Sequence, residues 1–324
     1  MMKTKLKQFR VRAGLTQAEL AKKVGITQPN YQRWEAGSAP VPEQKLKKLA
    51  KVLKTSPAAI LGRHPPIEAR LYDDSAGDHL DYYGEVAIHF SGRGAPLLLS
   101  ISEEAFSNLH RDLQLNTAFV TVKSLANQTV AIRINAIADL YFSSEAHDDY
   151  GPEHDKYEEH SLLHMPYPRD WEIVEALEHD DGAEDFDPAD VQRVKQSIMI
   201  TDEQYARLVA DGRIKAEDLE AERKKNQKET DRIFKLASRT AYQLSTGQRR
   251  EVYADNEEDL YNAFYELTEF DGGEAAEGMI LLPAEGRHRI VFINKAALDY
   301  VSIPTHKYEA GSVEAAAAAM EATK

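Results

Sequence analysis

The chain contains no cysteine. Disulfide bonds, thiolate metal ligands and cysteine nucleophiles are therefore excluded, and this composition fits a reducing compartment. The chain also has no apolar run of the ~18–20 residues that a membrane-spanning helix needs. Its basic first residues are not followed by the apolar stretch of a secretory signal. We therefore expect a cytoplasmic protein that makes no contact with a membrane.

Motifs of the common enzyme classes are missing as well. The glycines of Gly92-x-Gly94 and Gly272-Gly273 lack the strand-to-helix context of a phosphate-binding loop. No serine nucleophile motif is present. The sequence therefore predicts that the protein is not an enzyme and has no catalytic residues and no cofactor.

Acidic residues outnumber basic ones in the whole chain, which has a net charge of -14, but the reverse holds at one end. Residues 1–63 contain 14 Lys and Arg and three Glu, whereas residues 64–324 contain 26 Lys and Arg and 51 Asp and Glu. A basic head on an acidic body is typical of a protein with a dedicated nucleic-acid face. Because phosphate repels the body, we expect DNA contact at the head alone.

The head is predicted to consist of short helices joined by tight turns. Apolar residues recur at helical spacing in five segments, Leu6–Ala13, Thr16–Val24, Thr27–Ala36, Glu43–Leu53 and Pro57–Leu61. Gly25 follows a helix end, where a positive φ is needed, and Thr16 and Thr27 are suitable N-caps. The sequence Arg63-His64-Pro65-Pro66 breaks the pattern and predicts the end of the domain.

The most specific motif is RVRAGLTQAELAKKVGITQPNYQRWEAG, residues 10–37. Its ungapped spacing Gln17-Ala18-x-Leu20-Ala21-x-x-Val24-Gly25-Ile26-Thr27-Gln28 resembles the helix-turn-helix of the phage repressor and Cro family, over about residues 5–61. The resemblance implies that duplex DNA is the partner and that the helix starting at Thr27 enters the major groove. It also implies that Gln17 caps the first helix onto a phosphate and braces Gln28, and that Arg10 and Glu35 form a partly buried ion pair.

Outward side chains in the first two turns of the second helix are the expected base contacts, because Tyr31 and Trp34 face the core. Gln can bond an adenine edge and Arg a guanine edge, whereas Pro29 offers only apolar contact. The loop 38–40 lacks basic residues, so either backbone amides or Lys45, Lys47 and Lys48 of the next helix are expected on phosphates. The predicted DNA-binding residues are Gln17, Thr27, Gln28, Pro29, Asn30, Gln32, Arg33, Lys47 and Lys48. A helical domain that contacts only protein is the alternative interpretation.

Beyond the head, short β-branched or alternating segments predict strands. They lie at Glu85–Phe90, Leu97–Ile101, Phe119–Lys123, Val130–Ile134, Leu140–Ser143, Met279–Leu282, Ile290–Ile293 and Tyr300–Ile303. Residues 170–242 favour helices, with a long charged stretch from Ala216 to Leu244, and Val313–Thr323 is either helical or disordered. The predicted divisions are the head at 1–63, a linker at 64–79, an α+β unit at 80–168, a helical insertion at 169–246, a second α+β unit at 247–308 and an alanine-rich tail at 309–324.

Two stretches of the body are similar to each other. In each, a strand leads to a polar cap, Ser102 or Asn256, and then to a Glu-Glu pair and an amphipathic helix. A hairpin follows that ends in Ile-Asn, at 134–135 or 293–294. We interpret this as a duplicated β-α-β-β-β unit, with chance similarity between capped helices and strands as the alternative. The predicted fold class is thus an all-α helix-turn-helix head followed by an acidic α+β body.

Four histidines lie in an acidic stretch, at His147, His154, His160 and His164. Such ligands can hold a divalent metal, but the sequence HSLLH lacks the glutamate of a zinc-protease helix. A solvated acidic connector is the simpler interpretation, so we predict no metal site.

These features predict a sequence-specific transcriptional regulator that acts as a repressor. A homodimer is expected because one head contacts few phosphates and bases. Ile233, Leu236 and Ala237 are the hypothetical dimer face, with packing in their own chain as the alternative. A different class of function is an antitoxin-like interaction module, whose acidic body binds a protein partner and whose head serves autoregulation.

Overall fold

The computed structural model describes residues 3–63, 82–115, 117–143, 165, 167–179, 182–269 and 277–322. The chain divides into two compact units. The first comprises Met1–Pro65, Arg169–Ala237 and Ala316–Lys324, and the second comprises Pro66–Pro168 and Ser238–Ala315. Among the described helices, none has the length and apolar character needed to cross a bilayer.

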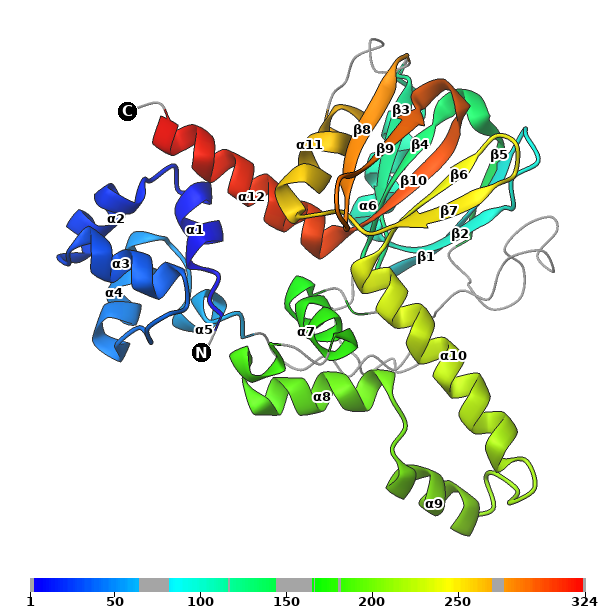
Figure 1. Ribbon diagram of the computed structural model, residues 1–324, viewed down its shortest axis with the longest axis horizontal. Helices are drawn as coiled ribbons and strands as arrows, with labels where there is room; N and C mark the ends of the chain where they lie inside the picture. Colours follow the sequence, from blue (N-terminus) through cyan, green and yellow to red (C-terminus); the bar gives the residue numbers. More distant parts are fainter. Residues whose placement is uncertain are drawn as a thin grey trace. The chain divides into compact units, whose positions relative to one another are not determined.

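The first unit begins with the five predicted helices of the head (Figure 1). They are α1 (Leu6–Arg12), α2 (Gln17–Val24), α3 (Gln28–Glu35), α4 (Glu43–Val52) and α5 (Pro57–Ile60). Their apolar faces form one core, in which Leu20, Tyr31 and Leu49 are inaccessible to solvent. The five predicted helices are confirmed, since their observed ends differ from the expected ones by at most one residue.

Further helices complete the first unit. They are α7 (Pro168–Glu178), the 3-10 turn η3 (Ala183–Asp185), α8 (Pro188–Ile198), α9 (Asp202–Ala210) and α10 (Leu219–Ser238). The start of the head is tied to α7, because Lys5 forms an ion pair with Glu172. Arg169 donates to the same carboxylate at 2.9 Å and, through Nη2, to the Lys3 carbonyl oxygen at 2.7 Å. These bonds hold the start of the head against α7 within the same unit.

The expected helix from Ala216 to Leu244 is wrong at its C-terminal end. Helix α10 stops at Ser238, and residues 240–244 form a strand, because the ladder partners available there outweigh helical propensity. Two of the residues predicted to form a dimer face, Ile233 and Ala237, are 3% and 0% exposed in the single chain. Burial within the chain, the alternative stated above, therefore accounts for their spacing.

The second unit contains the same order of elements twice: a hairpin, a helix, a second hairpin, a 3-10 turn and a final strand. The first half has β1 (Tyr82–Phe90), β2 (Leu97–Ser102), α6 (Glu103–Asp112), β3 (Phe119–Lys123), β4 (Gln128–Arg133), η1 (Ile134–Ala136) and β5 (Ile137–Ser143). The second half has β6 (Thr240–Leu244), β7 (Arg249–Val252), α11 (Glu257–Thr268), β8 (Met279–Ala284), β9 (Arg289–Asn294), η5 (Lys295–Ala297) and β10 (Leu298–Pro304). In each half the final strand pairs antiparallel with the first strand, β5 with β1 and β10 with β6.

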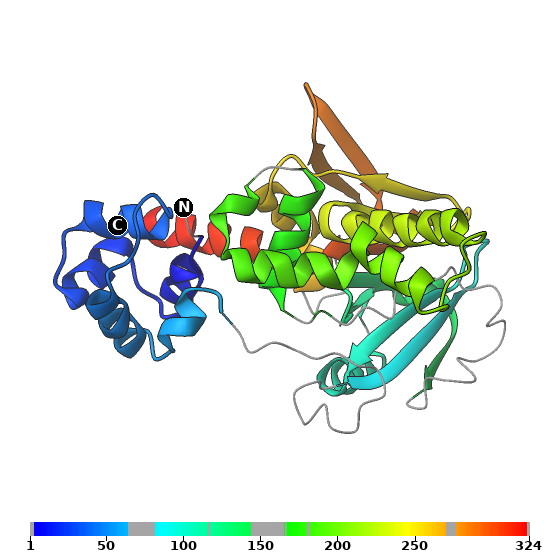
Figure 2. The ribbon, with the colours of Figure 1, turned by 90° about the horizontal axis from the view of Figure 1, so that it is seen from below.

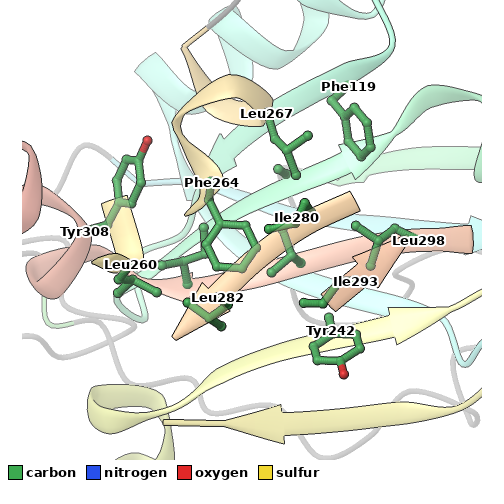
Figure 3. Packing of buried hydrophobic residues seen from close by; sticks show 13 residues of the cluster. Phe119, Tyr242, Leu260, Phe264, Leu267, Ile280, Leu282, Ile293, Leu298 and Tyr308 are labelled. Atoms are coloured by element: carbon green, nitrogen blue, oxygen red, sulfur yellow. The ribbon is translucent and has the colours of Figure 1, made fainter. Parts of the chain in front are cut away.

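These strands make three sheets, ordered β2-β1-β5, β3-β4-β10-β6-β7 and β8-β9. The two halves are joined by β4 and β10, which pair with Tyr300 opposite Ile132. One core packs α6 against the strands of the first half. The other packs α11 against the inner face of the β8–β9 hairpin, with Phe264 beside Ile280 (Figure 3). The last helix, α12 (Thr305–Ala322), begins directly after β10.

The predicted body strands all occur, although several are longer than expected and β6 was missed. However, the Ile-Asn pairs that match in the two sequence stretches do not occupy equivalent positions in the two halves. Ile134 and Asn135 lie in η1, whereas Ile293 and Asn294 end β9, so the two Ile-Asn pairs are not at equivalent positions. Strand ends are set by pairing partners, which a two-residue motif does not report. The tail predicted as helical or disordered is helical up to Ala322.

Several predictions concern residues that lie outside the described parts of the chain. They include the linker at 64–79 and the histidines between His147 and His164. Among the residues that are described, three or more His, Cys, Asp or Glu side chains nowhere gather in a way that could hold a metal ion. The predicted absence of a metal site in the histidine region thus stays a prediction.

Candidate DNA-binding surface

Helix α2 and the turn after it are built by local capping. The Thr16 hydroxyl accepts from the Glu19 amide at 3.3 Å, and the Glu19 carboxylate accepts from the Thr16 amide at 2.9 Å, which is a capping box. Gly25 ends the helix with φ 72° and ψ 53°, a left-handed conformation that glycine adopts without strain. Thr27 then lies at the N-cap position of α3 with extended backbone. The turn thus orients α3 relative to α2.

Helix α3 has one buried and one exposed face. Tyr31 and Trp34 are 0% and 8% exposed and belong to the core of the head. Six of the residues predicted to bind DNA are exposed here, namely Thr27, Gln28, Pro29, Asn30, Gln32 and Arg33. The structure therefore presents a polar surface that includes the exposed Arg33 side chain, as reading of base edges requires.

Gln17 links the start of α2 to α3. Its amide Nε2 donates to Glu35 Oε1 at 2.9 Å, and its Oε1 accepts from Gln32 Nε2 at 3.0 Å. The resemblance to the repressor family implied that Gln17 braces Gln28, and this is wrong for the described structure. Gln32 lies one turn further along α3, close enough to the start of α2 for the bond. Gln28 is left exposed.

The ion pair between Arg10 and Glu35 is confirmed. Arg10 donates from Nε to Glu35 Oε2 at 2.8 Å and from Nη2 to Oε1 at 2.9 Å, and the two side chains are 1% and 2% exposed. Burial raises the pKa of Glu35, but the hydrogen bonds from Arg10 and Gln17 outweigh it and hold the pKa below its usual value. Arg10 therefore serves the structure of the head, and its carboxylate partner also positions Gln17.

The predicted phosphate-binding lysines lie on α4. Lys45 donates to the carbonyl oxygens of Val24 and Gly25 at 3.4 and 3.3 Å, so it caps the C-terminus of α2. Lys48 Nζ is also close to Gly25. Lys47 forms an exposed ion pair with Glu43 at 2.7 Å. Lys48 lies near the C-terminal end of α2 and Gln17 at its N-terminal end. Because α2 is about 12 Å long, the two residues would contact different phosphates.

One contact at this surface joins residues 304 positions apart. The backbone amide of Gln17 donates to Glu321 Oε1 of α12 at 3.3 Å. Amides at a helix N-terminus attract anions, and DNA phosphates commonly occupy such positions. Sequence analysis missed Glu321, since no local pattern in an alanine-rich tail signals a partner so distant.

Residues 6–60 match the family model described as helix-turn-helix. The head is a helix-turn-helix domain of the phage repressor and Cro type. Domains of this kind are typical of DNA-binding transcription regulators. No curated protein and no solved structure matches the chain. In the helix-turn-helix domain seen here, Gln28 and Arg33 of α3 are exposed, and both side chains carry the paired hydrogen-bonding groups that base edges can accept.

Proposed function

We propose that the protein is a sequence-specific transcriptional repressor that reads the major groove with α3 and binds as a homodimer. The observation that carries this proposal is the division of α3, with its aromatic side chains in the core and its polar side chains exposed. Gln28 and Arg33 read base edges. Gln17, held by Glu35, and the exposed lysines Lys47 and Lys48 contact phosphates, while Thr27, Pro29, Asn30 and Gln32 line the same surface.

Base and phosphate contacts are expected to respond differently to mutation, because only base contacts distinguish sequences. Gln28→Ala should weaken binding to the selected site by roughly 1–3 kcal/mol and should change binding to scrambled duplex much less. Lys48→Ala is the matched contrast. It should weaken both duplexes similarly and lower the log–log salt slope by about one unit.

The measurement is competition binding at several salt concentrations, on a site first selected from a random duplex library. Circular dichroism confirms that each variant is folded. Arg33→Ala tests the guanine contact in the same assay, with an additional loss on all duplexes that reflects its charge. Full discrimination between the two duplexes by folded Gln28→Ala would show that α3 is not the recognition helix.

The two halves of the second unit are also proposed to be copies of one unit. The shared order of seven elements and the shared pairing of first and last strands support this, although the residue match differs from the expected one. An antitoxin-like interaction module is the second candidate function, favoured by the apolar side chains that β8 and β9 expose. Co-purification with a different polypeptide at a fixed ratio would support that candidate against a simple repressor.

A further inference from the structure

The hairpin β3–β4 is covered on its outer edge by the other half of the unit. Strand β4 pairs with β10, so that Ala131 lies opposite Val301 and Thr129 opposite Ile303. As a result Ala131 and Thr129 are 0% and 1% exposed. This pairing joins the last strand of the second half to the second hairpin of the first half.

The hairpin β8–β9 has the same place in the second half, but its outer edge is not paired with another described strand. Within the described strands, β9 pairs only with β8. Residues 289–294 of β9 correspond to residues 128–133 of β4, so Phe292 and Ile290 stand where Ala131 and Thr129 stand in the first half. Phe292 and Ile290 are 60% and 57% exposed, and Figure 2 shows this orange hairpin projecting from the other strands of the unit.

Among the described strands, β5 has the complementary unpaired edge. It corresponds to β10, yet among the described strands it pairs only with β1 and ends its sheet. Leu140 and Phe142 of β5 pack on the core of the first half and are only partly buried, and Tyr141 is 38% exposed. Open strand edges that carry apolar side chains promote aggregation unless another strand covers them.

We propose that β9 of one copy of the chain pairs antiparallel with β5 of a second copy. The register of β4 with β10, carried over to these strands, places Phe292 opposite Leu140 and Ile290 opposite Phe142. A second copy is the occupant because the chain itself supplies the matching edge, and because the pairing repeats one already made within the chain. Two copies that exchange both strands form a two-fold dimer in which neither β5 nor β9 is an edge strand.

This inference rests on the proposed homodimer and names its interface, but its test does not involve DNA. Because the chain has no cysteine, single cysteines report the pairing cleanly. Leu140→Cys and Phe292→Cys variants, one of them tagged so that the mixed dimer has its own size, are co-expressed and then oxidised. The expected product is a disulfide-linked mixed dimer as the main species.

The matched control replaces Phe292→Cys with Leu115→Cys, a residue of the same unit that is 47% exposed. This pair is expected to give no mixed dimer above background. Sedimentation velocity provides a second measurement, in which Phe292→Asp should convert a dimer into a monomer while Leu115→Asp does not. Circular dichroism verifies that both variants are folded.

Two results would overturn the pairing. One is equal cross-linking of the test and control pairs, and the other is a dimer that persists in folded Phe292→Asp. A wild-type monomer that binds its DNA site with full discrimination would reject this interface and the homodimer, while leaving the base contacts of α3 intact. Cross-linked copies without any sequence discrimination would instead reject the recognition helix alone.

Discussion

The helix-turn-helix head and the strands of the second unit are held together over different distances along the chain. In the head, Arg10 and Glu35 are 25 residues apart, and α2 carries its own apolar face and capping box. In the second unit, the strands that join the two halves place Ile132 opposite Tyr300, 168 residues away. A fold held by local contacts can be predicted from short sequence patterns. A strand that pairs over a long distance has many possible partners of similar sequence, so its pairing cannot be predicted in this way.

The two regions also differ in charge. Residues 1–63 carry an excess of Lys and Arg, and the rest of the chain carries almost twice as many acids as basic residues. Close to the surface predicted for DNA, the acidic part of the chain contributes Glu321, whose carboxylate accepts from the start of α2. A carboxylate there competes with phosphate for the same amide. The comparison therefore predicts where a mutation affects folding and where it affects DNA binding.

The largest expected effect is in the second unit. Phe264 of α11 is fully buried between this helix and the β8–β9 hairpin (Figure 3). Phe264→Ala should lower the free energy of unfolding by about 3–5 kcal/mol, because the cavity adds to the lost burial. Urea denaturation followed by circular dichroism measures this. Asn262→Ala, at an exposed position on the same helix, should change it by less than about 0.5 kcal/mol. Equal losses for the two variants would contradict the packing of α11.

A somewhat smaller effect is expected in the head from Glu35→Gln. At neutral pH the substitution leaves Arg10 buried without its carboxylate, which should cost on the order of 3 kcal/mol. The folded pKa of Glu35 lies below the ordinary value of 4.5. The stabilisation by its charge is therefore fully present above pH 4.5 and is lost as the pH falls through the folded pKa.

The difference in stability between wild type and Glu35→Gln should accordingly be largest at neutral pH and should shrink in acid. Thermal melts from pH 7 to pH 3 measure it. Glu43→Gln, which changes an exposed carboxylate of α4, is the control and should differ little from wild type. A difference that stays constant down to pH 3 would mean that the charge of Glu35 is not what stabilises the head.

The smallest expected effect concerns Glu321. Glu321→Gln removes a charge that opposes phosphate at the start of α2, so all duplexes should bind about two- to five-fold more tightly at low salt, with the gain fading as salt rises. Glu217→Gln removes an equal charge at an exposed position outside the head and should change binding less. Fluorescence anisotropy on a scrambled duplex measures both. Identical gains would show that net charge, rather than the contact with Gln17, is responsible.

Much of the candidate site follows from the sequence alone. The spacing of Leu20, Tyr31 and Trp34, the capping residue Thr16 and the glycine at 25 predict α2, the turn and α3 to within one residue. The exposed face of α3 consists of the positions that remain once these buried positions are assigned. Such features involve residues within about four positions of one another, and helical periodicity together with capping chemistry decides them. The strands of the body are likewise indicated by their alternation.

Only the tertiary structure decided the rest. Three features depend on groups that are far away in the chain. They are the bond between Gln17 and Gln32, the contact of Glu321 with the start of α2, and the change from α10 to β6 at residue 240. The partner of β4 was also decided by the tertiary structure, because the sequence of an apolar alternating strand does not indicate which strand pairs with it. The sequence determined the local elements and the helix offered to DNA, while long-range pairing determined which edges are closed and which remain open.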